Sequence, residues 1–271
     1  ERQAGYIYRP VRERTRETLM RQAHELVDCT GYDEISLLSL STGDYSDIHR
    51  LVPEIIDGME EQHVSVSLPS LRIDSFLKDD LEKMQSIRKA GLTFAPEAGT
   101  QRLRDVINKN VTEEDLFRAC RDAFESGWTS VKLYFMIGLP TETDEDILGI
   151  AELCRKVSRI FYEMPKEKRG KGLRLSASAS TFVPKPFTPF QWFAQVPLEE
   201  IRRRQQLLRN AMKGIRGVEF HCHLSQLSVL EAAFSRGDRK LADILETAYR
   251  KGCRFDSWSE HFDEQAWREA F

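Results

Sequence analysis

The sequence predicts an α/β protein, a partial (β/α)6 TIM-like barrel followed by a helical C-terminal extension. Six short apolar segments alternate with amphipathic helical segments, and successive strands begin about thirty residues apart or somewhat more, as βα units do. This alternation favours a parallel sheet wound into a barrel or part of one. The 271 residues suffice for one barrel of roughly 200 to 250 residues and an extension.

The segment 131–146 is the most informative unit. Residues 131–137 are apolar and rich in β-branched and aromatic side chains, which suits a buried parallel strand. Gly138 and Pro140 end the strand, and Thr141 or Thr143 can cap a helix whose acidic first turn complements its dipole. The same reasoning predicts further strands at 35–40, 63–68, 92–95, 173–181 and 217–221.

Helical periodicity fills the intervals between these strands. Thr112 followed by Asp115 is the pattern of an N-cap with an acidic third residue. From residue 223 onward the pattern is helical only, so we expect a barrel over 1–222 and an extension over 223–271. The expected helices are 14–28, 48–61, 76–89, 101–107, 112–125, 144–161, 197–213, 227–234, 238–251 and 263–271.

Composition narrows the class of protein. The net charge is −3 with 41% hydrophobic and 31% charged residues, which describes a globular protein without a global excess of basic residues for nucleic acid. No apolar stretch approaches the roughly 18 residues that span a bilayer, and the start lacks the pattern of a signal peptide. Five scattered cysteines, none at C-x-x-C or C-x-x-x-C spacing, indicate reduced thiols. We therefore expect a cytoplasmic protein with no membrane partner.

Polar residues follow four of the predicted strands, where loops of parallel α/β folds build ligand sites. Asp44 and Glu97 could hold an ammonium group or a pair of sugar hydroxyls, and Arg72 and Lys109 could hold a carboxylate. Together they predict a pocket for a zwitterionic ligand that bears a sugar. For each residue, the alternative is an ordinary surface cap or turn.

The order of motifs STGDYSD, SLPSLRID, FAPEAGTQRLRDVINKN, MIGLPTETDED and STFVPKPFTPFQW resembles the radical S-adenosylmethionine (SAM) superfamily. More narrowly, it resembles the group labelled iron-sulfur oxidoreductases, which carries an N-terminal cobalamin-binding-type domain. The resemblance runs from residue 3 to about 195, and the segment HCHLSQLSVLEAAFSRGD, which begins at His221, is also similar.

This resemblance implies a role for each strand-end loop in binding SAM, the small-molecule cofactor. The first loop would hold the methionyl ammonium, Glu97 the ribose, and Lys109 the methionyl carboxylate, where many members carry an arginine. The loop after residue 137 and the end of the predicted strand 173–181 would contact adenine. The implied cofactor-binding residues are Thr42, Gly43, Asp44, Ser70, Arg72, Glu97, Lys109, Gly138, Leu139, Pro140, Ser180 and Phe182.

The chain departs from the family at the [4Fe-4S] cluster, which members bind through a C-x-x-x-C-x-x-C loop. Its last cysteine would stand immediately before Gln3, where this chain has Arg2. Because such clusters require thiolates, we expect an inactive fragment that lacks its first strand and cluster loop, with tag residues at Glu1 and Arg2. The resemblance implies that the intact enzyme generates a 5′-deoxyadenosyl radical with electrons from a reductant protein. The resemblance is compatible with cobalamin as a further cofactor, and it does not identify the substrate.

Several features have competing interpretations. The basic run 202–216 would suit RNA phosphates, although a solvated helix face is the favoured interpretation. His221 and His223 lie on one face of a strand and Cys222 on the other, which disfavours a metal site. Residues 183–193 could border a substrate opening or pack over the barrel. The whole chain could instead be a non-catalytic partner-binding scaffold, or a TIM-barrel enzyme with Glu97 as general base.

Overall fold

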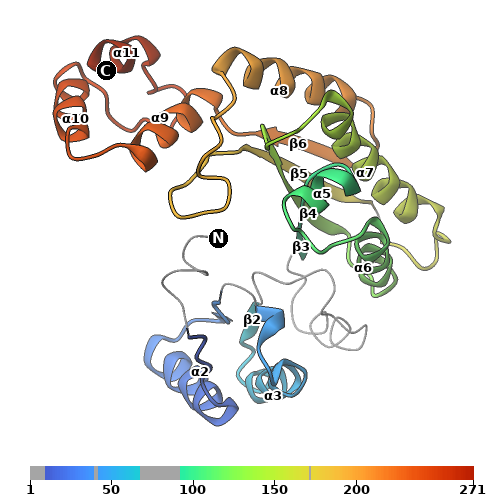
Figure 1. The fold of residues 1–271 in the computed structure, drawn as a ribbon. Coiled ribbons are helices and arrows are strands. Elements are labelled where there is room, and N and C mark those ends of the chain that lie inside the picture. The colour runs from blue at the N-terminus through green and yellow to red at the C-terminus, as the bar shows by residue number, and fades with distance from the viewer. Residues whose placement is uncertain (1–9, 40–41, 68–91, 171) are drawn as a thin grey trace.

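The structure is a computed structural model that describes residues 10–39, 42–67, 92–170 and 172–271. Within these ranges it has two parallel sheets. β1 (Glu34–Ser36) pairs with β2 (Ser65–Ser67). A four-stranded sheet has the order β3-β4-β5-β6, which is also the order of these strands along the chain (Figure 1). Its strands are β3 (Leu92–Glu97), β4 (Ser130–Ile137), β5 (Arg174–Thr181) and β6 (Val218–Cys222).

Helices connect these parallel strands, as the βα pattern predicts. α7 packs against α6 and α8, and α7 and α8 lie along one side of the four-stranded sheet (Figure 1). α2 packs against α3, which in turn contacts β2. In the described ranges, the helices before β6 are α2 (Arg16–Thr30), α3 (Ile48–Glu60), α5 (Gln101–Val106), α6 (Glu113–Glu125), α7 (Asp144–Glu163) and α8 (Leu198–Met212), with a 3-10 turn η1 (Thr42–Asp44) after β1.

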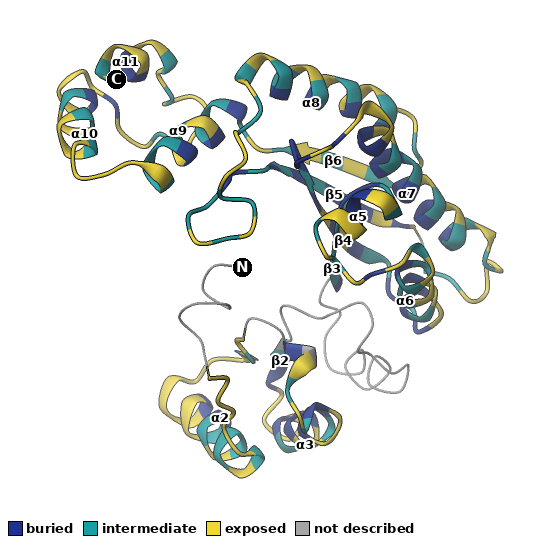
Figure 2. Cartoon of the chain, viewed as in Figure 1, coloured by how far each residue is buried: buried dark blue, intermediate teal, exposed yellow. Residues whose placement is uncertain are grey.

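Burial alternates along the central strands and gives the sheet two unlike faces. On β4, Val131, Leu133 and Phe135 are buried in the main core with residues of α7, whereas Lys132 and Tyr134 between them are exposed. β5 follows the same alternation in register with β4. The helices therefore cover one face of the sheet, and Figure 2 shows their buried residues turned toward the strands.

The chain beyond β6 is helical. α9 (Ser225–Arg236), α10 (Leu241–Arg250) and α11 (Glu264–Ala270) share a small core that includes Ala248, Cys253 and Trp267. The Trp267 ring meets Phe234 edge-on, with ring centroids 5.8 Å apart. None of the helices in the described ranges has the length and apolar character that crossing a membrane requires.

The α/β fold class and all six predicted strands are confirmed, although β1 and β2 are shorter than predicted and β3 extends to Glu97. β1 ends at Ser36, short of the predicted end at residue 40, and Leu38 is 89% exposed. An apolar run continues as a strand only while a neighbouring strand pairs with it, and β2 pairs with three residues of β1. The predicted helix 76–89 lies outside the described residues.

The loop after β3 crosses α7 at unusually close range because both segments carry a glycine there. A Cβ atom placed on Gly99 would lie 2.2 Å from the carbonyl oxygen of Asp146 and 2.3 Å from the amide nitrogen of Ile150. A Cβ on Gly149 would in turn lie 2.9 Å from the Gly99 oxygen. This contact fixes the loop after β3 against the first turns of α7.

Gly99→Ala should therefore destabilise the fold by about 1–3 kcal/mol, because the added methyl group meets backbone that cannot rotate away. Chemical denaturation of the variant measures this loss. Gly172→Ala is the matched control, since a Cβ there meets nothing within 4 Å. Equal denaturation midpoints for the two variants would contradict the close crossing.

Candidate functional site

The end of β3 brings a carboxylate and an ammonium group together. Glu97 has a φ of 68°, a left-handed conformation that non-glycine residues adopt rarely and chiefly at functional sites. The Lys109 Nζ lies 3.5 Å from the Glu97 Oε1, and the two side chains are 34% and 26% exposed. Burial raises the pKa of Glu97, and the nearby Lys109 opposes that rise. A carboxylate accessible to a ligand thus stands at the carboxyl end of the sheet.

Arg104 hydrogen-bonds to backbone next to both members of this pair. Its guanidinium is buried, and it donates from Nη1 to the Ala98 oxygen at 3.0 Å and from Nε to the Val111 oxygen at 3.1 Å. Ala98 follows Glu97 directly, and Val111 lies two residues after Lys109. The buried Arg104 therefore fixes the backbone on either side of the pair, a role that the sequence did not reveal.

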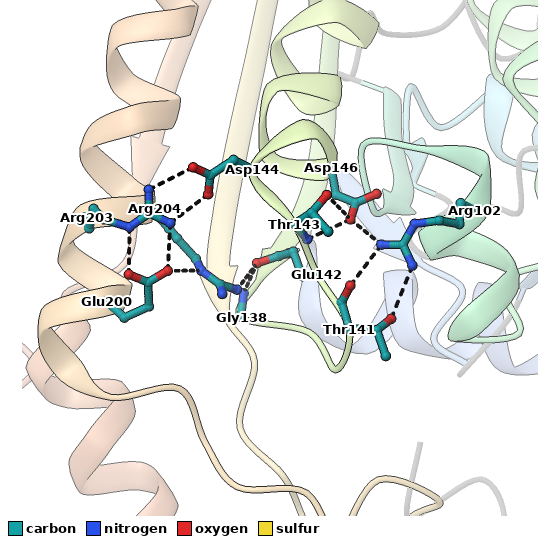
Figure 3. A network of polar contacts seen from close by, with 10 residues as sticks. All are labelled: Arg102, Gly138, Thr141, Glu142, Thr143, Asp144, Asp146, Glu200, Arg203 and Arg204. Carbon is teal, nitrogen blue, oxygen red and sulfur yellow. Dashed lines mark hydrogen bonds and ion pairs between the residues drawn. The ribbon is translucent and has the colours of Figure 1, made fainter.

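The turn after β4 is held by a second buried carboxylate. Gly138 has a φ of 84°, and its N–H donates to the Glu142 Oε2 at 2.6 Å. Arg204 on α8 donates from Nη1 to the same oxygen at 2.7 Å (Figure 3). Burial raises the pKa of Glu142 to about 7, against the opposing effect of the hydrogen bonds from Gly138 and Arg204. The turn thus takes its shape from a helix that begins more than fifty residues later.

The start of α7 is tied to the loop after β3 through Asp146. This carboxylate accepts hydrogen bonds from Arg102 and from the Thr143 N–H (Figure 3). It also accepts one from the Thr100 hydroxyl. Burial opposes ionisation, but these bonds lower the pKa of Asp146. Thr143 is therefore the N-cap, whereas Thr141, the other predicted cap, has a φ of 66° and accepts from Arg102 at 2.9 Å through its carbonyl oxygen.

An apolar cluster joins three of the predicted loops. Leu139 is buried, and it packs with Ala98 from the loop after β3 and with Phe182 just after β5. The Phe182 N–H donates to the Ile137 oxygen at 2.8 Å, which seats it beside the end of β4. The remaining members are Leu103, Ile107 and Met136. The structure thus brings Glu97, Leu139 and Phe182 to the same end of the sheet.

Three further residues lie at the ends of β4 and β5. Pro140 is buried, and Ser180 donates to the Phe135 oxygen at 3.4 Å. The Thr181 hydroxyl is buried and has no hydrogen-bond partner within the described part of the chain. Thr181 lies between Ser180 and Phe182, which the family resemblance assigns to adenine, and its signal in the sequence is a hydroxyl at a covered position of an alternating strand.

The first two predicted loops are described only in part. Thr42 and Asp44 form η1, where Thr42 is buried and its hydroxyl lies 3.5 Å from the Leu37 oxygen, while Asp44 is exposed. Gly43 lies between them. Ser70 and Arg72 lie outside the described residues.

Metal-ligating side chains do not gather in the described ranges. They contain no group of three or more His, Cys, Asp or Glu side chains placed to hold an ion. Burial raises the pKa of Cys154 to about 12 and that of Cys222 to about 11, so these thiols resist ionisation.

Known proteins resemble this chain in sequence and fold. The sequence profile of the radical SAM superfamily matches residues 3–154. An uncharacterized protein of Methanocaldococcus jannaschii is 35% identical over 249 residues, which are 90% of this chain and 50% of that protein. The chain thus spans half the length of this relative.

Crystal structures of SuiB from Streptococcus suis share the fold. With its precursor peptide SuiA bound, SuiB gives a TM-score of 0.52 at 11% identity over 81% of this chain and 45% of SuiB. A second SuiB structure gives the same TM-score and identity over 88% of this chain and 50% of SuiB.

The raised pKa of Glu142 predicts how stability depends on pH. A carboxyl group whose pKa is higher in the folded than in the unfolded chain stabilises the fold below its unfolded value of 4.5, and this contribution is lost as pH rises through about 7. In Glu142→Gln, which keeps an acceptor for the Gly138 N–H but cannot ionise, this loss should disappear. Between pH 5 and 8, the free energy of unfolding of the native protein should therefore fall relative to the variant, on the order of 1 kcal/mol.

Urea denaturation of both proteins across this pH range measures the difference. Glu163→Gln changes an exposed residue at the other end of α7, and its free energy of unfolding should depend on pH as that of the native protein does. Parallel curves for the native protein and Glu142→Gln would refute the pKa assignment.

Proposed function

We propose, because this chain belongs to the radical SAM superfamily, that its strand-end loops bind SAM and that the full-length protein is a radical SAM enzyme. Superfamily enzymes carry out SAM-dependent radical chemistry with a [4Fe-4S] cluster. The observation that carries the proposal is the convergence of the Glu97–Lys109 pair with the apolar cluster around Leu139 and Phe182 at one end of the sheet. The substrate, cobalamin and an RNA partner are not part of the proposal.

Glu97 is suited to the ribose. Its carboxylate oxygens can accept hydrogen bonds from two neighbouring hydroxyl groups, and its partly buried position makes those bonds stronger than they would be in water. Arg104 holds the backbone that carries it. Lys109, 3.5 Å from Glu97, is a point charge that can turn toward the methionyl carboxylate while it still neutralises Glu97.

The adenine would lie against the apolar cluster. Phe182 is partly buried and offers apolar surface, the buried Leu139 packs in the same cluster, and the turn over Gly138 and Pro140 would bring backbone groups close to a flat ring. Ser180 adds a hydroxyl at the end of β5. The methionyl ammonium is assigned to Thr42, Gly43 and Asp44. Ser70 and Arg72 are assigned to the SAM site from the sequence resemblance alone.

The iron-sulfur cluster does not fit the residues of this chain. The five cysteines are Cys29, Cys120, Cys154, Cys222 and Cys253, and none stands at the spacing of a cluster loop. Cys120 and Cys154 are buried in the main core. When bound together, SAM and a reduced cluster supply an adenosyl radical, but the residues described here act in binding and orienting SAM.

Glu97→Gln should weaken SAM binding about 10- to 100-fold, because it removes charge-assisted hydrogen bonds worth about 1.5–3 kcal/mol. Calorimetric titration of the full-length protein with its cluster in place measures this change, and thermal unfolding checks that the variant is folded.

Glu163→Gln, far from the strand ends, is the control and should bind SAM like the native protein. A non-catalytic scaffold predicts no SAM binding in either protein. Native-like affinity in Glu97→Gln would remove Glu97 from the site.

A further inference from the structure

The segment between β5 and α8, residues 182–197, carries a series of aromatic rings in mutual contact. The Phe182 ring meets Phe190 edge-on with ring centroids 6.1 Å apart, and Phe190 meets Phe193 in the same way at 5.5 Å. Phe182 is partly buried against the apolar cluster at the strand ends. The rings therefore extend from the strand ends into a segment whose own backbone forms neither helix nor strand.

Helix α9 of the C-terminal extension holds this segment through polar contacts, and the two lie side by side in Figure 1. The Lys185 Nζ donates to the Ser235 Oγ at 2.9 Å and forms an ion pair with Glu231. Arg236 donates from Nη1 to the Phe193 oxygen at 3.2 Å. Glu231 and Ser235 share one face of α9 because they stand four residues apart. The segment is thus held by a helix outside the βα units.

Gln195 makes the contact that is nearest to the strand ends. Its Nε2 donates to the Phe182 oxygen at 3.4 Å and to the Ser228 oxygen on α9 at 3.0 Å, so both hydrogen atoms of the amide are used. The N–H of Phe182 donates to the Ile137 oxygen at 2.8 Å. The two polar backbone groups of Phe182 are therefore fixed from opposite sources, the N–H by β4 and the carbonyl by α9 through Gln195.

The same stretch of the segment reaches the turn after β4. A Cβ atom placed on Gly138 would lie 3.5 Å from the Val196 Cγ2. Val196 follows Gln195 directly, so the residue beside the one that holds Phe182 lies against Gly138. Two of the elements to which the proposed function assigns adenine, Phe182 and the turn at Gly138, therefore both contact residues 195–196.

Helix α9 is itself fixed by packing with other parts of the chain. Leu230 and Phe234 on α9 pack against the small core of the extension, which includes Trp267. On α8, the buried Gln205 donates from Nε2 to the His223 oxygen, just before α9, at 2.8 Å. Because α9 is held by both the extension and α8, it can set the position of the segment that it contacts.

We infer that Gln195 is a positioning residue of the SAM site, and that the C-terminal extension, through α9, sets the position of Phe182 against the adenine. This inference rests on the proposed function, which places adenine beside Phe182. Gln195 acts through the Phe182 carbonyl and not by contact with SAM. Lys185 supports the far end of the same segment. Its ion pair with Glu231 has side chains 34% and 56% exposed, and such pairs contribute little to stability, so its effect is on orientation.

Calorimetric titration of the full-length protein, with its cluster in place, with SAM tests the inference. Gln195→Met keeps the length of the side chain but removes both donors, and it should weaken SAM binding about tenfold. Lys185→Met should weaken it about threefold. Gln206→Met is the matched control and should bind like the native protein, because Gln206 is an exposed residue of α8 that hydrogen-bonds to Asn210. Thermal unfolding checks that each variant is folded.

A double-mutant cycle distinguishes positioning from a general effect on the fold. Phe182→Leu removes the ring that Gln195 is inferred to position. Adding Gln195→Met to it should therefore weaken SAM binding further by less than about twofold. Added to Glu97→Gln, a change on the ribose side, Gln195→Met should keep its full effect of about tenfold, because the two residues act on different parts of SAM.

The outcomes separate this inference from the proposed function. A small further loss with Phe182→Leu and a full loss with Glu97→Gln support the inference. Native-like SAM affinity in Gln195→Met, or a loss that multiplies fully with Phe182→Leu, overturns it while SAM binding stands. If Gln195→Met does not fold, Lys185→Met in the same cycle decides by the same criteria. A native protein that does not bind SAM overturns the proposed function instead.

Discussion

The division of the four-stranded sheet into a covered and an open face is the constraint on which the rest of the structure depends. Helices α6, α7 and α8 bury the residues of β4 and β5 that point to them. The alternate residues must then point to the other side, because successive side chains of a strand leave opposite faces. Apolar burial on one side therefore fixes the positions of Glu97 at the rim and of Tyr134 and His221 on the open face.

Two buried carboxylates connect the helices to the loops at the strand ends through hydrogen bonds. Glu142 connects the turn at Gly138 to Arg204 of α8, and Asp146 connects α7 to Thr100 after β3. A buried carboxylate is costly unless its oxygens are hydrogen-bonded, so each one specifies a single loop geometry. The rim of the sheet is therefore held by polar contacts, whereas its base is held by apolar packing.

Local sequence patterns predicted most of the fold. The short apolar run 131–137 and the Thr112–Asp115 capping box are features of adjacent residues, and both appear as expected. Long-range contacts could not be predicted in this way. Arg204 stands on a basic helix whose charges looked solvated, yet it is paired inside the protein with a carboxylate 62 residues away in the sequence.

The same distinction holds for the candidate site. Glu97 and Gly138 could be predicted because each stands at the end of a predicted strand. The family resemblance then assigned Glu97 to the ribose and Gly138 to the adenine. The unpaired Thr181 hydroxyl and the polar residues of the open face depend on which strands are neighbours and in which register, which only coordinates provide. Periodicity could say that His221 and His223 share a face but not which residues stand opposite them.

The crossing of Gly99 and Gly149 has a consequence for how such a sequence can change over time. Each residue is already the smallest available, so neither can shrink to compensate for growth of the other. A substitution at either position would therefore clash with backbone of the other segment. Both positions are restricted to glycine although neither contributes a side chain to the core or the site.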